Sequence, residues 1–190
     1  NLISMNNSVS NWMSWEGGVD LVAVTQSGLA MPNIIFHVAR MVHTPVGSAP
    51  AGMVFYQPDP TAPPALLGFV SQDPTVGKYF GPKIFAGTPF EHAPVLSAKI
   101  DIDSSKPGEV SATVMVDGFV LKTRLSGLQP AELIQRAPAA MPPFWQQGVE
   151  AAASAAELAV NGSRVAIQLP PVGITGGPAA VWSPCGVYAR

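Results

Sequence analysis

Alternation of apolar and polar residues is clearest between residues 110 and 125. Val110–Val116 alternates, the dipeptide Asp117-Gly118 follows, and Phe119–Leu125 alternates again. Asp-Gly between two alternating runs favours a two-residue type I′ turn, because both of its residues tolerate positive φ. The pattern therefore predicts an antiparallel hairpin over Val110–Leu125.

Other apolar segments predict short strands joined by turns. The longest segment without Pro or Gly, Asn33–Thr44, is mostly apolar on both faces and is therefore expected to be a central strand. The remaining expected strands are Val19–Gln26, Met53–Tyr56, Leu66–Val70, Val95–Ile102, Arg164–Leu169 and Ala179–Ala189. Asp73–Pro89 is dense in Gly and Pro, and we expect it to be largely irregular.

A helical pattern comes late in the chain. Pro130–Arg136 allows two helical turns, and Phe144–Val160 is rich in Ala. The longer segment follows Pro142-Pro143 and ends at Asn161-Gly162, the expected asymmetry of helix termini. The predicted fold class is mainly β (α+β). It is a curved antiparallel sheet or β-barrel around an apolar pocket, with one Ala-rich helix near the C-terminus.

The domain organisation follows from the length of 190 residues, which suits one domain. Residues 1–18 are polar with interspersed Trp12, Met13 and Trp15, and predict an N-terminal arm over the body or over a partner. Residues 19–190 are then a single β domain.

Charge excludes several classes of protein. Ten Lys and Arg against twelve Asp and Glu give a net charge of -2, and no basic run is present to neutralise a nucleic-acid backbone. No stretch approaches the ~18 consecutive apolar residues of a membrane span. The first basic residue is Arg40, so no signal peptide is visible. The one cysteine, Cys185, allows no internal disulfide. We therefore expect a cytoplasmic protein, with Cys185 inert in the core.

The histidines do not predict a metal site. His37, His43 and His92 lack the short spacing of zinc ligands. On one strand face, His37 and His43 would lie roughly 20 Å apart at ~3.3 Å per residue. They are therefore interpreted as strand histidines satisfied by hydrogen bonds. Neither metal nor cofactor is expected, since phosphate-binding Gly loops and G-x-S-x-G are also missing.

Two lysines lie in unusual surroundings. Lys78 and Lys83 belong to the apolar, aromatic, Gly-rich segment Val76–Gly87. Desolvation disfavours the ammonium form of a lysine and lowers its pKa, and a neutral amine can form a Schiff base with a carbonyl. The alternative is that each apolar stem packs on the protein while its ammonium group stays in water.

The segment Gly81-Pro82-Lys83-Ile84-Phe85-Ala86 resembles the lysine segment of the acetoacetate decarboxylase family. Four other short matches appear in the family's order and extend the resemblance over most of residues 33–190: Phe36–Thr44, Ser111–Met115, Asn161–Leu169 and Ala180–Tyr188. The resemblance implies a lyase in which Lys83 attacks the ketone of a small oxo acid. The resulting protonated imine would accept the electrons released by decarboxylation or proton removal.

The sequence also departs from the family. Ile84 occupies the position of the family's second lysine, whose charge helps to lower the pKa of the nucleophile, and Lys78 is the candidate replacement. Tyr56 and Gln57 lie near the position expected for the catalytic Glu, while Arg40 is a candidate for binding the substrate carboxylate.

Two other functions stay open. One is a non-catalytic β-barrel that binds a small hydrophobic ligand, with Lys83 in a structural role. The other is an assembly subunit whose Trp12/Trp15 arm docks on a neighbour, and a homo-oligomer is expected in either case.

Overall fold

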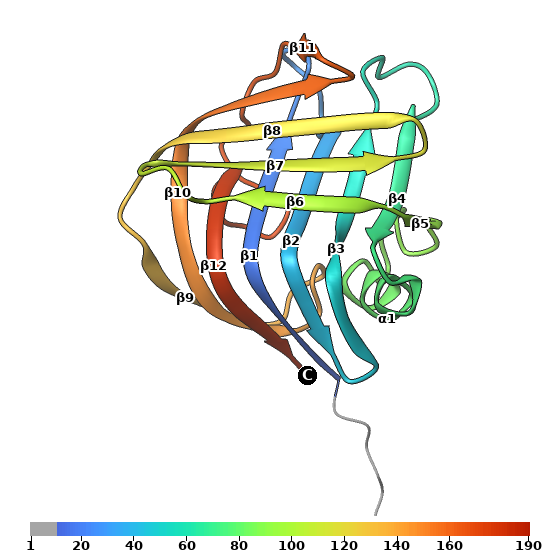
Figure 1. Cartoon of the computed structure of the whole chain (residues 1–190), viewed down its shortest axis with the longest axis vertical. Coiled ribbons are helices and arrows are strands. Elements are labelled where there is room, and N and C mark those ends of the chain that lie inside the picture. The colour runs from blue at the N-terminus through green and yellow to red at the C-terminus, as the bar shows by residue number, and fades with distance from the viewer. Residues whose placement is uncertain (1–10) are drawn as a thin grey trace, which may run out of the picture.

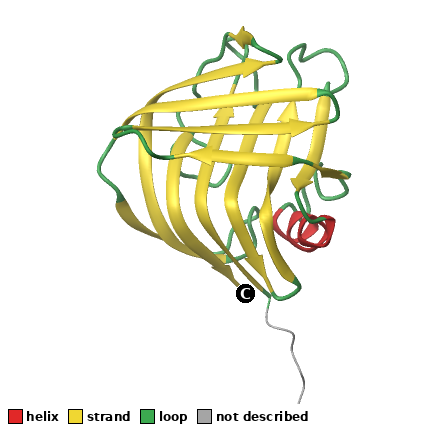
Figure 2. Ribbon diagram, viewed as in Figure 1, coloured by secondary structure: helices red, strands yellow, loops and turns green. Residues whose placement is uncertain are grey.

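Twelve strands and one helix make up residues 11–190, the part of the chain that this computed structural model describes (Figures 1 and 2). The mainly β fold class is confirmed. In chain order the elements are β1 (Trp12–Ala23), β2 (Ile34–Thr44), β3 (Gly47–Tyr56), β4 (Leu66–Ser71), α1 (Pro74–Ile84), β5 (Val95–Ser97), β6 (Lys99–Asp103), β7 (Glu109–Val116), β8 (Phe119–Leu128), β9 (Glu132–Arg136), β10 (Trp145–Val160), β11 (Ser163–Val165) and β12 (Ala180–Ala189).

The strands form one strongly curved sheet, nearly closed into a barrel, in the order β5-β4-β3-β2-β1-β12-β10-β8-β7-β6. Figure 1 shows β6, β7 and β8 running across β1–β4 and β12 as a second layer. The long strand β10 joins the layers, because its first half pairs with β12 and β9 and its second half with β8. Only β4 and β5 are parallel, and α1 is the crossover between them.

Several predicted elements are confirmed. β2 lies between β1 and β3, as expected of a strand with two apolar faces. β7 and β8 form the predicted hairpin, with φ of 48° at Asp117 and 76° at Gly118. Positive φ at both central residues is the signature of the type I′ turn.

Two hydrophobic cores lie on opposite faces of the first layer. Ile34, Phe36 and Val38 point into the space between the layers, which packed side chains fill. Ile35 and Ala39 point to the other face, where they pack with Phe80 of α1. The period of two along β2 thus divides the molecule into an interlayer core and an α1-side core.

Irregular positions at one level of the sheet change which face the side chains use. In β1, Gly17 has φ of 65°. Trp15 precedes it and Asp20 follows it, and both line the same α1-side cavity although strict alternation would place residues five apart on opposite faces. In β2, Arg40 and Met41 together oppose one residue of β3 in a bulge. Because of these irregularities, strict alternation does not predict on which face of the sheet a side chain lies once β1 and β2 pass Gly17 and Arg40–Met41.

The Ala-rich helix predicted over residues 144–160 is wrong, because this segment is β10. Its backbone pairs with β8, β9 and β12, and such pairing overrides a weak intrinsic preference for helix. Asn161-Gly162, interpreted as a helix end, is instead the β10–β11 hairpin turn, with φ of 51° and 81°. The short helix predicted over 130–136 is also wrong, since Glu132–Arg136 is strand β9.

The segment expected to be irregular, Asp73–Pro89, contains the helix α1. Asp73 caps it by accepting a hydrogen bond from the backbone N–H of Thr75 at 2.9 Å, and Pro74 follows at the first turn. Its glycines permit close packing, because a Cβ on Gly77 would lie 2.9 Å from Val95 Cγ1. The glycines taken as helix breakers are therefore contact positions against the sheet.

The expected N-terminal arm is described only in part. Residues 12–18 belong to β1, where Trp12 pairs with Ala189 of β12, and residues 1–10 lie outside the described chain. The single helix of the described chain lacks the length and hydropathy that a membrane-spanning helix needs.

Candidate functional site

A small cavity of about 100 Å³ lies between the α1-side face of the sheet and α1, and we call it the α1 pocket. Its walls are mostly apolar and aromatic. Among them are Met13, Trp15, Ala39, Met53, Phe80, Ile84, Phe85, Met141, Ile174 and Tyr188. The polar side chains Asp20, His37, Ser14 and Thr175 also line it, and of these only Asp20 and His37 are ionisable. An apolar cavity with a few convergent polar groups is the usual form of a small-molecule site.

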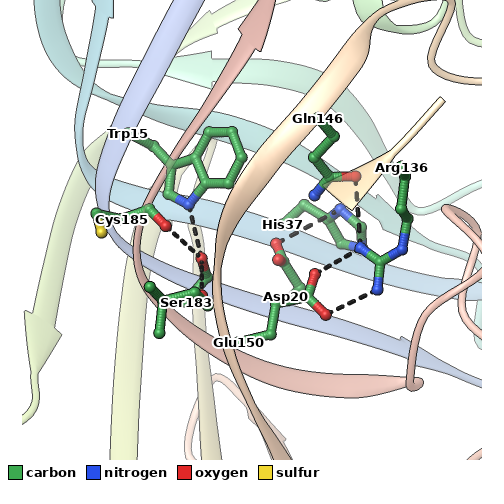
Figure 3. Close-up of polar contacts among 9 residues, drawn as sticks. Trp15, Asp20, His37, Arg136, Gln146, Glu150, Ser183 and Cys185 are labelled. Atoms are coloured by element: carbon green, nitrogen blue, oxygen red, sulfur yellow. Dashed lines mark hydrogen bonds and ion pairs between the residues drawn. The ribbon is translucent and has the colours of Figure 1, made fainter. Parts of the chain in front are cut away.

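Asp20 and His37 form a pair across neighbouring strands. The register of β1 and β2 places them directly opposite each other, and His37 Nδ1 lies 3.5 Å from Asp20 Oδ1 (Figure 3). The other ring nitrogen, His37 Nε2, is buried and has no hydrogen-bond partner among the described residues 11–190. A buried polar atom without a partner costs roughly 1–3 kcal/mol, so this nitrogen of a pocket-lining residue calls for an explanation.

A second ion pair lies beside the first. Arg136 of β9 donates to both carboxylate oxygens of Glu150, at 2.7 and 2.9 Å, and also contacts Gln146 Oε1 at 3.4 Å (Figure 3). Glu150 sits at the irregularity between β10 and β12, where β10 places one residue opposite two of β12. With only 11 % of its side chain exposed, Glu150 depends on Arg136 for charge compensation.

These groups perturb one another. Burial raises the pKa of the Asp20 carboxyl, His37 and Arg136 oppose the rise, and the charge of Glu150 adds to it. Asp20 lines two cavities, and 37 % of its side chain is exposed. Burial also raises the pKa of the Tyr188 hydroxyl, and the charges of Asp20 and Glu150 add to that rise. Strongly perturbed groups gathered in a cavity are typical of functional sites.

Trp15 is a fixed wall of the α1 pocket. Its indole N–H donates to Ser183 Oγ at 2.9 Å, and the Ser183 hydroxyl donates to the Val149 carbonyl at 2.7 Å (Figure 3). The ring lies against Gly186, where a Cβ would overlap it, and its centroid is 4.8 Å from that of Tyr188. Hydrogen bonding and close packing together hold the indole in one position.

A larger apolar groove adjoins the α1 pocket. Its volume is about 440 Å³, and its lining includes Met31, Phe90 and Val172. Met141 and Ile174 line both the groove and the pocket, so these two side chains form the boundary between them.

The largest described hollow has different chemistry. It measures about 460 Å³ and lies over β7, β8 and β10, and four of its charged lining residues pair with one another. Arg124 contacts Glu157 at 2.8 Å and Glu109 at 3.6 Å, and Arg164 contacts Glu157 at 3.3 Å. Exposed charges that pair with one another are well solvated and gain little from a ligand. This hollow is therefore a weaker candidate for a ligand-binding site than the α1 pocket.

The two candidate lysines both lie on α1, but the described lining of the α1 pocket includes neither. Lys83 Nζ lies 3.9 Å from the centroid of the Tyr79 ring and donates to the Tyr79 carbonyl at 3.4 Å. Lys78 is exposed. Five residues along a helix correspond to about 140° of rotation and ~7.5 Å of rise, so the two ammonium groups leave α1 in different directions.

The structure does not bring the other candidate residues to those lysines. Arg40 is exposed, donates to Ser104 Oγ at 2.9 Å and lies 6.0 Å from the Trp182 ring. Tyr56 packs at the interlayer core against Phe119, with centroids 6.4 Å apart. Gln57 donates to the Ala62 carbonyl at 2.7 Å.

The interpretation of two other side chains changes. His43 bonds to Ser48 and Glu16, as expected of a structural histidine, whereas His37 leaves Nε2 without a partner. Cys185 is exposed, so its prediction as a core thiol is wrong. Sequence reasoning missed Asp20, although an acidic residue within the apolar run Val19–Ala23 was a usable signal.

Comparison of the chain with protein-family models gave no match, and comparison with curated proteins gave none either. The resemblance of residues 81–86 to the acetoacetate decarboxylase family therefore stays a prediction. The chemistry of the α1 pocket is the basis for the function inferred below.

Proposed function

We propose that this protein binds a small, largely apolar molecule in the α1 pocket. The observation that carries the proposal is the α1 pocket itself, which is mostly apolar and is lined by Asp20 and by His37, whose buried Nε2 has no hydrogen-bond partner among the described residues. An occupant with one polar atom would satisfy Nε2 and place its apolar part against the surrounding aliphatic and aromatic side chains.

The volume limits the size of the occupant. A cavity of ~150 Å³ holds benzene in a well-studied protein, so about 100 Å³ suits a molecule of roughly five heavy atoms. A longer apolar chain would have to pass Met141 and Ile174 into the adjoining groove. Short-chain molecules are therefore the preferred probes.

An NMR titration with 1-butanol tests this proposal. We expect saturable shift changes at the backbone amides of Phe80, Ile84 and His37, because these residues line the pocket. Ala39→Leu adds carbon atoms to the pocket wall and should abolish the changes. Ala155→Leu is the matched control on an exposed strand position, and it should leave them intact. Equal shift changes in both variants, or none in the unmodified protein, would refute binding at this place.

The Schiff-base lyase implied by the family resemblance is the second candidate. The observation that favours it is that Lys83 is adjacent to Ile84 and one turn from Phe80, both of which line the α1 pocket. A change of side-chain rotamer would have to bring the amine from Tyr79 to the cavity. Arg40, Tyr56 and Gln57 lie elsewhere, so a substrate oxo acid would need other binding groups.

Borohydride trapping separates the two candidates. The protein is incubated with acetoacetate and borohydride, and the adduct is located by peptide mapping. A lyase of this type should be modified at Lys83 and lose the adduct in Lys83→Arg, whereas Lys78→Arg should keep it. If no adduct forms at Lys83, the lyase candidate is refuted, and ligand binding in the α1 pocket is the function that stands.

A further inference from the structure

We infer that the polar group recognised in the α1 pocket is a primary ammonium group, so that the preferred ligand is a small alkylammonium ion. This inference rests on the proposed function, because it names the ligand class of the same site. The resemblance to a decarboxylase implies a ligand of the opposite charge, since an oxo acid carries a negatively charged carboxylate. Charge balance, hydrogen-bonding capacity and aromatic walls all favour the cation.

The charges around the pocket sum to a negative value. Arg136 and Glu150 form a bidentate pair and cancel each other, whereas His37 is the one described residue within ion-pair distance of Asp20. The groups that act on Asp20 come from β2, β9 and β10, and Arg136 is the one permanent cation among them. With Asp20 ionised and His37 neutral, a net charge of about −1 remains, which attracts a cation and repels a carboxylate.

His37, which lines the same pocket, has one ring nitrogen without a partner among residues 11–190. In a neutral imidazole one nitrogen donates and the other accepts. We assign the proton to Nδ1, because that nitrogen faces the Asp20 carboxylate at 3.5 Å. Nε2 then carries a lone pair and needs a donor. An ammonium group has three N–H donors, so it can donate to the Asp20 carboxylate and still have donors for a second acceptor such as Nε2, whereas a hydroxyl has a single proton to donate.

The walls suit a cation with a short apolar tail. Trp15 and Tyr188 lie on one side, with ring centroids 4.8 Å apart, and Phe80 and Phe85 line the pocket from the α1 side. Aromatic faces attract ammonium ions, most strongly where water is excluded. The n-butylammonium ion has about five heavy atoms, which suits the volume of about 100 Å³.

Three probes of equal chain length test the inference: n-butylammonium, 1-butanol and butyrate. Their dissociation constants are measured by NMR titration at one pH and one ionic strength. We expect n-butylammonium to bind about tenfold or more tightly than 1-butanol, because charge-assisted hydrogen bonds exceed neutral ones, and butyrate to bind most weakly. Asp20→Asn should remove most of the preference for n-butylammonium over 1-butanol.

Each outcome is informative. If butyrate binds as tightly as n-butylammonium, or if Asp20→Asn leaves the order unchanged, the ammonium assignment is overturned while binding in the pocket survives. If none of the three probes binds, the proposed function fails as well. Should Asp20→Asn be unfolded, Glu150→Gln replaces it, because removing this charge leaves Arg136 uncompensated and should also weaken n-butylammonium binding.

Discussion

The packing of Trp15 against Gly186 gives a quantitative prediction. Gly186 has no positive φ, so Ala fits the backbone there, but its Cβ would lie 2.5 Å from Trp15 Cη2. The indole has little room to move, since its N–H is bonded to Ser183 at 2.9 Å. Overpacking typically costs about 1–3 kcal/mol and a lost hydrogen bond about 1 kcal/mol. Gly186→Ala should therefore lower the free energy of unfolding by about 2–4 kcal/mol.

A double-mutant cycle isolates this contact. Urea unfolding, followed by circular dichroism, is measured for the unmodified protein, Gly186→Ala, Trp15→Leu and the double variant. In the Trp15→Leu background the added methyl group has space, so Gly186→Ala should cost less than about 1 kcal/mol. An equal cost in both backgrounds would show that the indole is not held against Gly186, and the rigid wall of the α1 pocket would be refuted.

Three other predictions concern charge and exposure. Because burial raises the pKa of Asp20 above its usual 3.8, the folded protein retains this proton to higher pH than the unfolded chain. The carboxylate therefore costs stability as the pH rises above about 4, and Asp20→Asn should gain stability relative to the unmodified protein over that range in urea unfolding. A constant difference between the two proteins would contradict this. Arg136→Met leaves the Glu150 charge partly buried and should cost about 1–3 kcal/mol, with part of the loss recovered in Arg136→Met/Glu150→Met; no recovery would argue against their coupling. Cys185 should react with a maleimide in the folded protein as fast as an exposed thiol, and labelling that requires urea would place it in the core.

Local patterns predicted the strands better than the helices. The hairpin at Asp117-Gly118 and the central strand β2 depend on alternation and turn chemistry within a few residues, which the sequence contains directly. β10 was predicted as a helix because Ala favours helix locally, whereas its structure is decided by pairing with strands that are distant in sequence. The helix α1 was missed for the converse reason, since Gly77 and Gly81 serve its packing against the sheet.

The candidate site depended on register, which the sequence does not specify. Asp20 and His37 are recognisable as polar residues in apolar strands, but only the pairing of β1 with β2 places them opposite each other. The bulge at Arg40 and Met41 cannot be read from alternation, so His37 and His43 were placed on one face of a regular strand. Arg136 and Glu150 were assigned to helices, and their ion pair became visible only with β9 and β10 in place.

Side-chain ¹⁵N NMR of the histidines tests the central claim most directly. The account predicts that His37 carries its proton on Nδ1 and leaves Nε2 bare in the free protein. On addition of n-butylammonium, Nε2 of His37 should change its shift saturably, while the ring nitrogens of His43 and His92 keep theirs. A proton on Nε2 of the free protein, or a His37 ring that is indifferent to the probe, would contradict the account.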